Sequence, residues 1–335
     1  MNFSILWPHH REDRDNSIEI SAIGEGITPV FGGGMRNVSD EQWASCDGIV
    51  GTQPPPDSMQ KLQRCRIFVK TAVGYDDVDL DAWSSRGIPV CNVPDYGTRE
   101  VADHAIALMM TLTKSIAFHD ESLRADPRAN WRPALNPFGR RMSDCTFGVI
   151  GLGRIGTATA RRAKAFDMDV TFFDPYQPSG VELALGIRRS DSLEELVGES
   201  DVISVHTPLS DATRNLLNKE VFAVAKRGCI VINTARGPIV DIDALYDAMK
   251  DGTVLAAGLD VLPEEPASVE RPLIRAWLND EEGMKHRLVV TPHSAFFTPE
   301  SIRDIRAFAA RTAARFLRDG RLTNCVNLAD LTTNL

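Results

Sequence analysis

This chain of 335 residues lacks several features that assign proteins to well-known functional classes. It has no excess of basic residues, because its formal net charge is -9, whereas nucleic acids and anionic membranes bind basic surfaces. It has no apolar run long enough to span a bilayer, and its first residues, MNFSILWPHHRED, contain too short an apolar stretch for a signal peptide. We therefore expect a cytoplasmic protein with no nucleic-acid or membrane partner.

Cys-x-x-Cys pairs, which mark redox and zinc sites, are also missing. The six cysteines are widely separated in the sequence, which predicts reduced thiols in apolar segments and no metal centre. Hydrophobic residues make up 43% of the chain, an ordinary share for a globular protein, and the length of the chain favours two domains over a single core.

Two series of short apolar runs alternate with helix-like segments. The first contains FSILW, DGIVGT, RIFVK and IPVCN, and the second contains TFGVIG, DVTFF, SDVISV, GCIVIN, LAAGL and RLVV. A long apolar helix is expected over 98–124, and a last helix over 299–317 precedes a tail, RLTNCVNL, that should fold back on a domain. Repeated strand–helix–strand units predict an α/β fold with two doubly wound parallel sheets.

The second series opens with a nucleotide-binding signature. Gly151, Gly153 and Gly156 have the G-x-G-x-x-G spacing between a strand and a helix, where backbone N–H groups can bind a pyrophosphate. Arg154 lies in the same loop. Asp174 ends the next strand, where a carboxylate can bind the ribose hydroxyls and disfavour a 2′-phosphate, so the pattern favours NAD over NADP. The alternatives are that the three glycines form a plain turn and that Asp174 is a helix N-cap.

Polar residues follow three later strands of this series. Arg236 follows GCIVINT, Asp260 and the pair Glu264 and Glu265 follow LAAGL, and His293 follows RLVVTP. Ligands of open α/β sheets bind at the carboxyl ends of the strands. Hydride reduction of a ketone needs a proton donor, for which histidine is suited, and arginine can hold a substrate carboxylate with two parallel bonds. The set therefore predicts reduction of a 2-oxo acid, although each residue alone could be a cap or a surface group.

Seven motifs together resemble the D-isomer-specific 2-hydroxyacid dehydrogenase family across nearly the whole chain: VKTAVGYDDVDL, NVPDYGTREVADHAIALMM, TFGVIGLGRIG, HTPLSDATRNLL, VINTARGPIVD, GLDVLPEEP and TPHSAFF. The resemblance implies catalytic roles for Arg236, Glu265 and His293, with His293 as proton donor. It implies NAD contacts from the glycine loop and from a set at the strand ends: Gly151, Gly153, Arg154, Ile155, Gly156, Asp174, Thr207, Pro208, Thr234, Ala235, Arg236, Asp260 and His293.

The resemblance also implies a domain arrangement and an assembly. A flavodoxin-like catalytic domain is expected over 1–112 and 310–335, a Rossmann nucleotide-binding domain over 113–309, and two helices crossing between them. A homodimer through the nucleotide domain is expected. The substrate carboxylate would meet the backbone N–H groups of Ala72, Val73 and Gly74 together with Arg236.

The sequence is most similar to the branch of the family that contains the eukaryotic C-terminal binding protein and its bacterial counterparts. That branch implies substrate contacts for Lys70 and Phe296, and Asp77 replaces the asparagine that relatives usually have. We expect an NAD-dependent reductase of a small unphosphorylated 2-oxo acid such as glyoxylate or hydroxypyruvate. The alternatives are an NAD-sensing regulatory protein, a D-3-phosphoglycerate dehydrogenase and a formate dehydrogenase, against the last of which Glu265 argues.

Overall fold

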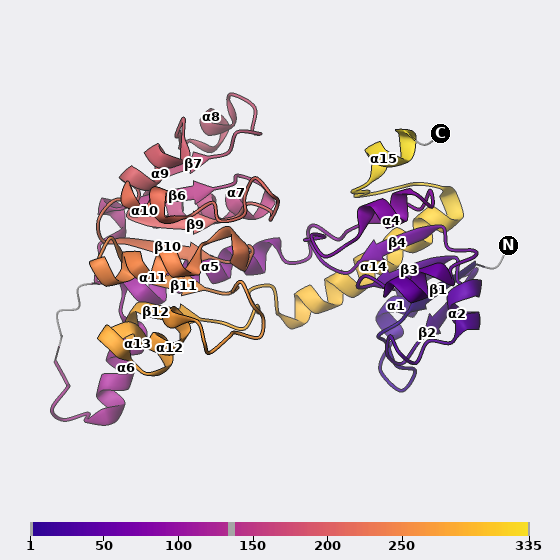
Figure 1. Cartoon of the computed structure of the whole chain (residues 1–335), viewed down its shortest axis with the longest axis horizontal. Coiled ribbons are helices and arrows are strands. Elements are labelled where there is room, and N and C mark those ends of the chain that lie inside the picture. The colour runs from indigo at the N-terminus through magenta and orange to yellow at the C-terminus, as the bar shows by residue number, and fades with distance from the viewer. Residues whose placement is uncertain (1–2, 133–137, 334–335) are drawn as a thin grey trace. The chain divides into compact units, whose positions relative to one another are not determined.

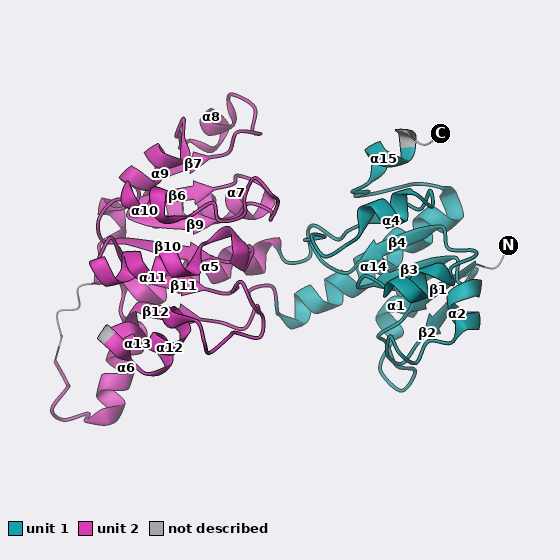
Figure 2. Ribbon diagram, viewed as in Figure 1, with its two compact units in different colours: residues 1–97, 297–335 teal, residues 98–296 magenta. Residues whose placement is uncertain are grey.

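The computed structural model describes residues 3–132 and 138–333, and the chain divides into two compact units (Figure 1). Unit 1 contains residues 1–97 and 297–335, and unit 2 contains residues 98–296 (Figure 2). These boundaries differ from the predicted ones, 112/113 and 309/310, which fall inside helices α5 (Thr98–Thr113) and α14 (Pro299–Asp319). The elements that α5 contacts most lie in unit 2 and those that α14 contacts most lie in unit 1, so each helix belongs to one unit.

Unit 1 is built on a five-stranded parallel sheet with the order β2-β1-β3-β4-β5. This is the flavodoxin-like order, as the sequence predicted. The strands are β1 (Phe3–Trp7), β2 (Ile27–Phe31), β3 (Gly48–Gly51), β4 (Ile67–Lys70) and β5 (Val90–Cys91). The helices are α1 (Ser17–Ile23), α2 (Asp40–Ser45), α3 (Pro56–Gln60), α4 (Leu80–Ser84), α14 and α15 (Leu328–Thr333).

Sequence reasoning missed strand β2 of this sheet. Pro29 lies in its middle, and proline cannot donate a ladder hydrogen bond, so the segment did not indicate a strand. The structure places β2 at the edge of the sheet, paired only with β1, where a proline is tolerated. The core beneath contains fully buried aromatic side chains, including Phe68 stacked on Trp83 with ring centroids 4.7 Å apart.

Unit 2 is built on a seven-stranded parallel sheet with the order β12-β11-β10-β9-β6-β7-β8 (Figure 1). Counted from β6, this is the Rossmann order with one further strand at the end. The strands are β6 (Thr146–Ile150), β7 (Asp169–Phe173), β8 (Arg188–Arg189), β9 (Val202–Val205), β10 (Cys229–Asn233), β11 (Val254–Leu259) and β12 (Leu288–Val290). The strand order reverses between β6 and β9, which is where such sheets bind nucleotides.

Helices cover the sheet of unit 2. They are α5, α6 (Ile116–Ala125), α7 (Arg154–Ala165), α8 (Val181–Leu185), α9 (Leu193–Glu199), α10 (Lys219–Ala223), α11 (Ile242–Asp251), α12 (Pro272–Leu278) and α13 (Met284–Arg287), with 3-10 turns η1 (Met142–Asp144), η2 (Gly237–Ile239) and η3 (Glu281–Gly283). The single helix predicted over 98–124 is two helices, because Ser115 adopts a left-handed backbone conformation with φ 54°. No single helix in the described ranges is long and apolar enough to cross a membrane.

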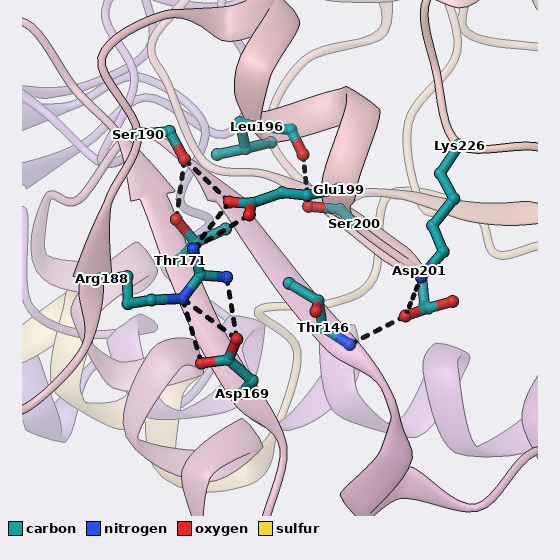
Figure 3. Close-up of polar contacts among 10 residues, drawn as sticks. All are labelled: Thr146, Asp169, Thr171, Arg188, Ser190, Leu196, Glu199, Ser200, Asp201 and Lys226. Carbon is teal, nitrogen blue, oxygen red and sulfur yellow. Dashed lines mark hydrogen bonds and ion pairs between the residues drawn. The ribbon is translucent and has the colours of Figure 1, made fainter.

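Short strand β8 was also missed, because it consists of two arginines rather than apolar residues. A polar network explains why it pairs at the sheet edge (Figure 3). Arg188 binds Asp169 of β7 at 2.8 Å and Glu199 of α9 at 2.9 Å. In the same view, buried Asp201 accepts the N–H of Thr146 and forms an ion pair with Lys226, both at 2.9 Å. These contacts anchor the edge and the amino ends of the strands, away from the carboxyl ends.

The tail folds back on unit 1, as predicted. The backbone at Cys325 forms an isolated antiparallel β-bridge with the backbone at Cys91, and both thiols are free. The hydrogen bonds of this bridge are Val326 N to Val90 O at 2.8 Å and Asn92 N to Asn324 O at 3.1 Å. A hydrogen bond between the two thiol groups lowers the pKa of Cys325 to about 7 and raises the pKa of Cys91. Burial raises the pKa of Cys145, and it raises the pKa of Cys229 to about 12.

Cys325 is therefore expected to be the first cysteine alkylated by iodoacetamide. The thiolate is the reactive form, so the rate of labelling should rise as the pH passes through about 7, where Cys91, Cys145 and Cys229, whose pKa values are raised, stay protonated. Peptide mass spectrometry after brief labelling between pH 6 and 9 measures this, and the Cys325→Ser variant should lack the fast site. Equal labelling of all six cysteines would contradict the assignment.

Candidate active site

The carboxyl ends of strands β10, β11 and β12 lie next to one another in unit 2, and each carries one of the predicted catalytic groups. Backbone hydrogen bonds connect them: Asp260 N donates to Asn233 O at 2.9 Å, and His293 N donates to Asp260 O at 2.8 Å. Arg236 follows β10, Glu265 follows β11 and His293 follows β12. One edge of one sheet therefore carries all three.

The structure brings His293 and Glu265 into direct contact. His293 Nδ1 lies 2.7 Å from Glu265 Oε2, and each side chain is 41% exposed. The other oxygen, Oε1, accepts the backbone N–H of Leu262 at 3.1 Å, which fixes the carboxylate. Because a carboxylate accepts but does not donate, the proton of this bond lies on Nδ1. His293 Nε2 is then the ring nitrogen that is not bound to Glu265, and it can carry a proton to a substrate oxygen.

Arg236 and the Glu265 loop approach one another closely through Gly237. A Cβ atom at position 237 would lie 1.9 Å from the carbonyl carbon of Leu262, so only glycine permits this approach. The turn is fixed by Asn233, whose side chain donates to Arg236 O at 2.9 Å and accepts from Ala235 N at 3.0 Å. The guanidinium donates to Ala235 O at 2.8 Å. Arg236 thus lies on a fixed turn that touches the loop of its predicted partner.

Asp260 organises the backbone around His293. Its buried carboxylate accepts the N–H groups of Ser294 and Ala295, each at 2.9 Å, and the hydroxyl of Thr291 at 2.6 Å. His293 itself has φ 50°, a left-handed conformation that is uncommon for a residue with a side chain. The hydrogen bonds from both sides of His293 to Asp260 stabilise this conformation.

The glycine loop after β6 fits a pyrophosphate. A Cβ atom at Gly156 would lie 2.0 Å from Gly151 O, and one at Gly151 would lie 2.9 Å from Thr207 N, so both glycines are needed for close packing. A Cβ atom at Gly153, by contrast, would meet nothing within 4 Å, which leaves open space beside the start of α7. Asp174 accepts the loop N–H of Leu152 at 2.8 Å, so the predicted ribose ligand lies directly beside the loop.

Two buried polar atoms at neighbouring strand ends also fit a bound nucleotide. Thr234 Oγ1 and His206 Nδ1 are buried and have no hydrogen-bond partner in the described part of the chain. Desolvation lowers the pKa of His206 to about 3, so its ring is neutral near pH 7. Such orphaned atoms next to Thr207, Pro208 and Ala235 are those that a dinucleotide could satisfy. The residues present therefore fit NAD, which would lie along Ile155 and Arg154 of the loop.

The predicted substrate residues lie in both units. In unit 1, the ammonium of buried Lys70 pairs with Asp77, so the residue that replaces the usual asparagine contacts Lys70 directly. Val73 O and Ala72 O accept from the Asn92 side chain and Val93 N at 2.7 and 3.1 Å. In unit 2, the ring of Phe296 stands edge-on to His293 at 6.3 Å between centroids. The assignment of Lys70, 72–74 and Phe296 to a substrate stays a prediction.

Sequence reasoning overlooked several residues that support the site. His104, Thr291 and Asn233 orient it through hydrogen bonds, and only Gly237, directly after Arg236, left a signal in the sequence. A glycine next to a predicted catalytic residue indicates a close backbone approach. The others are ordinary helix and strand residues whose contacts depend on tertiary structure.

The fold and the strand-end residues define a dinucleotide-binding oxidoreductase, and comparison with known proteins agrees. Residues 106–295 match the family model described as D-isomer specific 2-hydroxyacid dehydrogenase, NAD binding domain. The chain is 33% identical over 298 residues to glyoxylate reductase of Korarchaeum cryptofilum, covering 87% of this chain and 86% of that protein. The chain therefore belongs to the D-isomer specific 2-hydroxyacid dehydrogenases, an NAD-binding family of enzymes.

Other relatives differ in length and cofactor. D-3-phosphoglycerate dehydrogenase of Methanocaldococcus jannaschii is 33% identical over 282 residues, 84% of this chain, and this chain spans about half (51%) of its length. The NADPH-dependent glyoxylate/hydroxypyruvate reductase of Sinorhizobium meliloti has a TM-score of 0.82 at 27% identity, covering 99% and 98% of the two chains. D-lactate dehydrogenase of Aquifex aeolicus, solved with NAD and lactic acid, has a TM-score of 0.77 at 27% identity, covering 94% and 95%.

Proposed function

We propose that this protein reduces a small unphosphorylated 2-oxo acid, such as glyoxylate or hydroxypyruvate, to the D-2-hydroxy acid with NADH. The observation that carries the proposal is the 2.7 Å pair of His293 Nδ1 and Glu265 Oε2 at the carboxyl edge of a Rossmann sheet. The glyoxylate reductase of K. cryptofilum supports the choice of substrate class. Asp174 beside the glycine loop supports NADH over NADPH.

The residues divide the chemistry between them. When bound, NADH would supply the hydride for the carbonyl carbon. His293 Nε2 would donate the proton that the substrate oxygen takes up. Glu265 accepts the Nδ1 proton of the ring, which orients the imidazole and leaves Nε2 to carry the proton that is transferred. Arg236 binds the substrate carboxylate and draws electron density from the adjacent carbonyl. In the reverse direction His293 takes up the hydroxyl proton.

A steady-state screen tests this function. The purified chain is mixed with NADH or NADPH and a panel of 2-oxo acids: glyoxylate, hydroxypyruvate, pyruvate, a branched-chain 2-oxo acid and phosphohydroxypyruvate. We expect NADH oxidation, followed at 340 nm, with the small unphosphorylated acids, and slower oxidation of NADPH. Preference for phosphohydroxypyruvate would favour the phosphoglycerate alternative. NADH binding without turnover of any acid would favour an NAD-sensing regulatory protein instead.

We also propose that the chain forms a homodimer through unit 2. Helix α6 has no buried residue within the chain, and it begins with Ile116, which is 57% exposed. Trp131 nearby in the sequence is 78% exposed. Exposed apolar side chains that lie together in a patch mark protein–protein interfaces, and we propose that Ile116 and Trp131 belong to such a patch.

Light scattering coupled to size-exclusion chromatography is expected to give twice the mass of one chain. The Ile116→Asp and Trp131→Asp double variant should shift the mass towards one chain, because burying two carboxylates in an apolar interface is unfavourable. Leu183→Asp is the matched control, since Leu183 is 82% exposed on α8 and lies outside the proposed interface. A monomeric wild type would refute the proposal.

A further inference from the structure

A chain of three side chains links helix α5 to the loop that carries His293. His104 Nε2 of α5 lies 2.9 Å from Thr291 Oγ1, and Thr291 Oγ1 lies 2.6 Å from Asp260 Oδ1. His104 Nε2 is also 3.7 Å from Asp260 Oδ1, and its side chain is 24% exposed. All three residues belong to unit 2.

The direction of each hydrogen bond follows from counting protons. Asp260, as a carboxylate, only accepts, and it already accepts the N–H groups of Ser294 and Ala295. The single hydroxyl proton of Thr291 must therefore point to Asp260. Thr291 Oγ1 can then only accept from His104, so His104 Nε2 carries a proton. The donors run in one direction, from His104 through Thr291 to Asp260.

This polarity matters because Asp260 is buried, with 1% of its surface exposed. A buried carboxylate is costly unless donors satisfy it, and a donor that is itself hydrogen-bonded from behind is polarised and stronger. A hydroxyl left free to rotate would hold Asp260 less firmly. The backbone from Thr291 to Ala295, with His293 at φ 50°, depends on that carboxylate for its conformation.

We propose that His104 is a positioning residue for the reduction, acting through Thr291 and Asp260 on the orientation of His293. The expected loss of kcat rests on the proposed function. The expected hydrogen bonds of His104 and Thr291 do not. His104 touches neither the substrate nor Nε2 of His293 in this role. It supplies the donor that keeps the Thr291 hydroxyl turned towards Asp260.

The first test is structural and needs no turnover. A long-range 1H–15N spectrum of protein with labelled histidine, with His104 assigned by comparison with the His104→Gln variant, reports which ring nitrogen is protonated. At pH 9 we expect a proton on Nε2 of His104. A bare Nε2 would overturn the proposal, whatever the effect of the substitutions on kcat.

The second test compares two substitutions at position 104. Leucine removes the donor, whereas the side-chain nitrogen of glutamine can take the place of Nε2. We expect His104→Leu to lower kcat by about ten- to a hundredfold with KM nearly unchanged, the range seen for outer supporting residues, and His104→Gln to restore most of it. The control is His119→Leu, a histidine of α6 outside this network, which should retain wild-type kcat.

Undiminished kcat in His104→Leu, or equal losses in both variants, would overturn the proposal, because side-chain volume rather than the donor would then matter. Hydrogen exchange separates this failure from failure of the proposed function. The amides of Ser294 and Ala295 should exchange faster in His104→Leu than in His104→Gln, whether or not a 2-oxo acid is reduced. Equal exchange in both variants would overturn the proposed role of His104 and leave the proposed function untouched.

Discussion

Replacing His293 with asparagine is expected to lower kcat for 2-oxo acid reduction by about 10² to 10⁴, the usual contribution of a positioned general acid. Asparagine is the suitable replacement because it tolerates the left-handed backbone that His293 adopts at φ 50°, so the effect of lost chemistry is not mixed with strain. Binding of NADH, measured by quenching of protein fluorescence, should weaken far less than kcat falls, because His293 is one of many predicted NAD contacts. Steady-state kinetics at saturating NADH gives the loss in kcat.

Neighbouring carboxylates provide the control for this result. Glu265→Gln should lower kcat less than His293→Asn, because an amide oxygen can still accept the Nδ1 proton but carries no charge. Glu264→Gln should leave kcat unchanged, because Glu264 pairs with Arg271 at 2.7 Å instead of with His293. Undiminished turnover in His293→Asn would remove this residue from the acid role.

The second large effect is expected at Arg236. Changing it to glutamine should lower kcat/KM for the 2-oxo acid by about 10³, because the substrate carboxylate loses a charged, two-pronged donor while the carbonyl loses its polarising neighbour. The kcat/KM of Arg236→Lys should lie between those of the wild type and Arg236→Gln, because lysine retains the charge but lacks the planar pair of donors. The comparison is made with one substrate across a range of concentrations.

The position of Arg236 on a fixed turn makes the result interpretable. Asn233 holds the turn through its side chain at 2.9 Å from Arg236 O, a bond that the substitution leaves in place. Arg214→Gln, an exposed arginine of unit 2, should behave as wild type. If Arg236→Gln retained wild-type KM and kcat, the substrate carboxylate would have to bind elsewhere.

The sequence predicted much of the fold because its strands are apolar and its turns carry glycine. Both parallel sheets, the glycine loop after β6 and the strand-end positions of Arg236, Glu265 and His293 follow from such patterns. The errors occur where local composition and tertiary context disagree. Pro29 and the Arg188–Arg189 pair lie in edge strands, where pairing tolerates residues that a central strand excludes.

The supporting side chains could not be predicted in the same way. Thr291 and His104 are 187 residues apart in the sequence, and their 2.9 Å contact depends on how α5 packs against the sheet. The break at Ser115 likewise depends on a single left-handed residue in an otherwise helical pattern. Resemblance to a family predicted the reacting groups, whereas the residues that hydrogen-bond around them could be found only from coordinates.

The bond between Asp174 and the N–H of Leu152, at 2.8 Å, has a thermodynamic consequence. This hydrogen bond joins Asp174 to the glycine loop within the chain itself, so their relative geometry is set when the chain folds. Association then requires little further ordering of this region, and less of the interaction free energy is lost to conformational entropy. Affinity for the adenosine half should accordingly be governed by preorganisation rather than by induced fit.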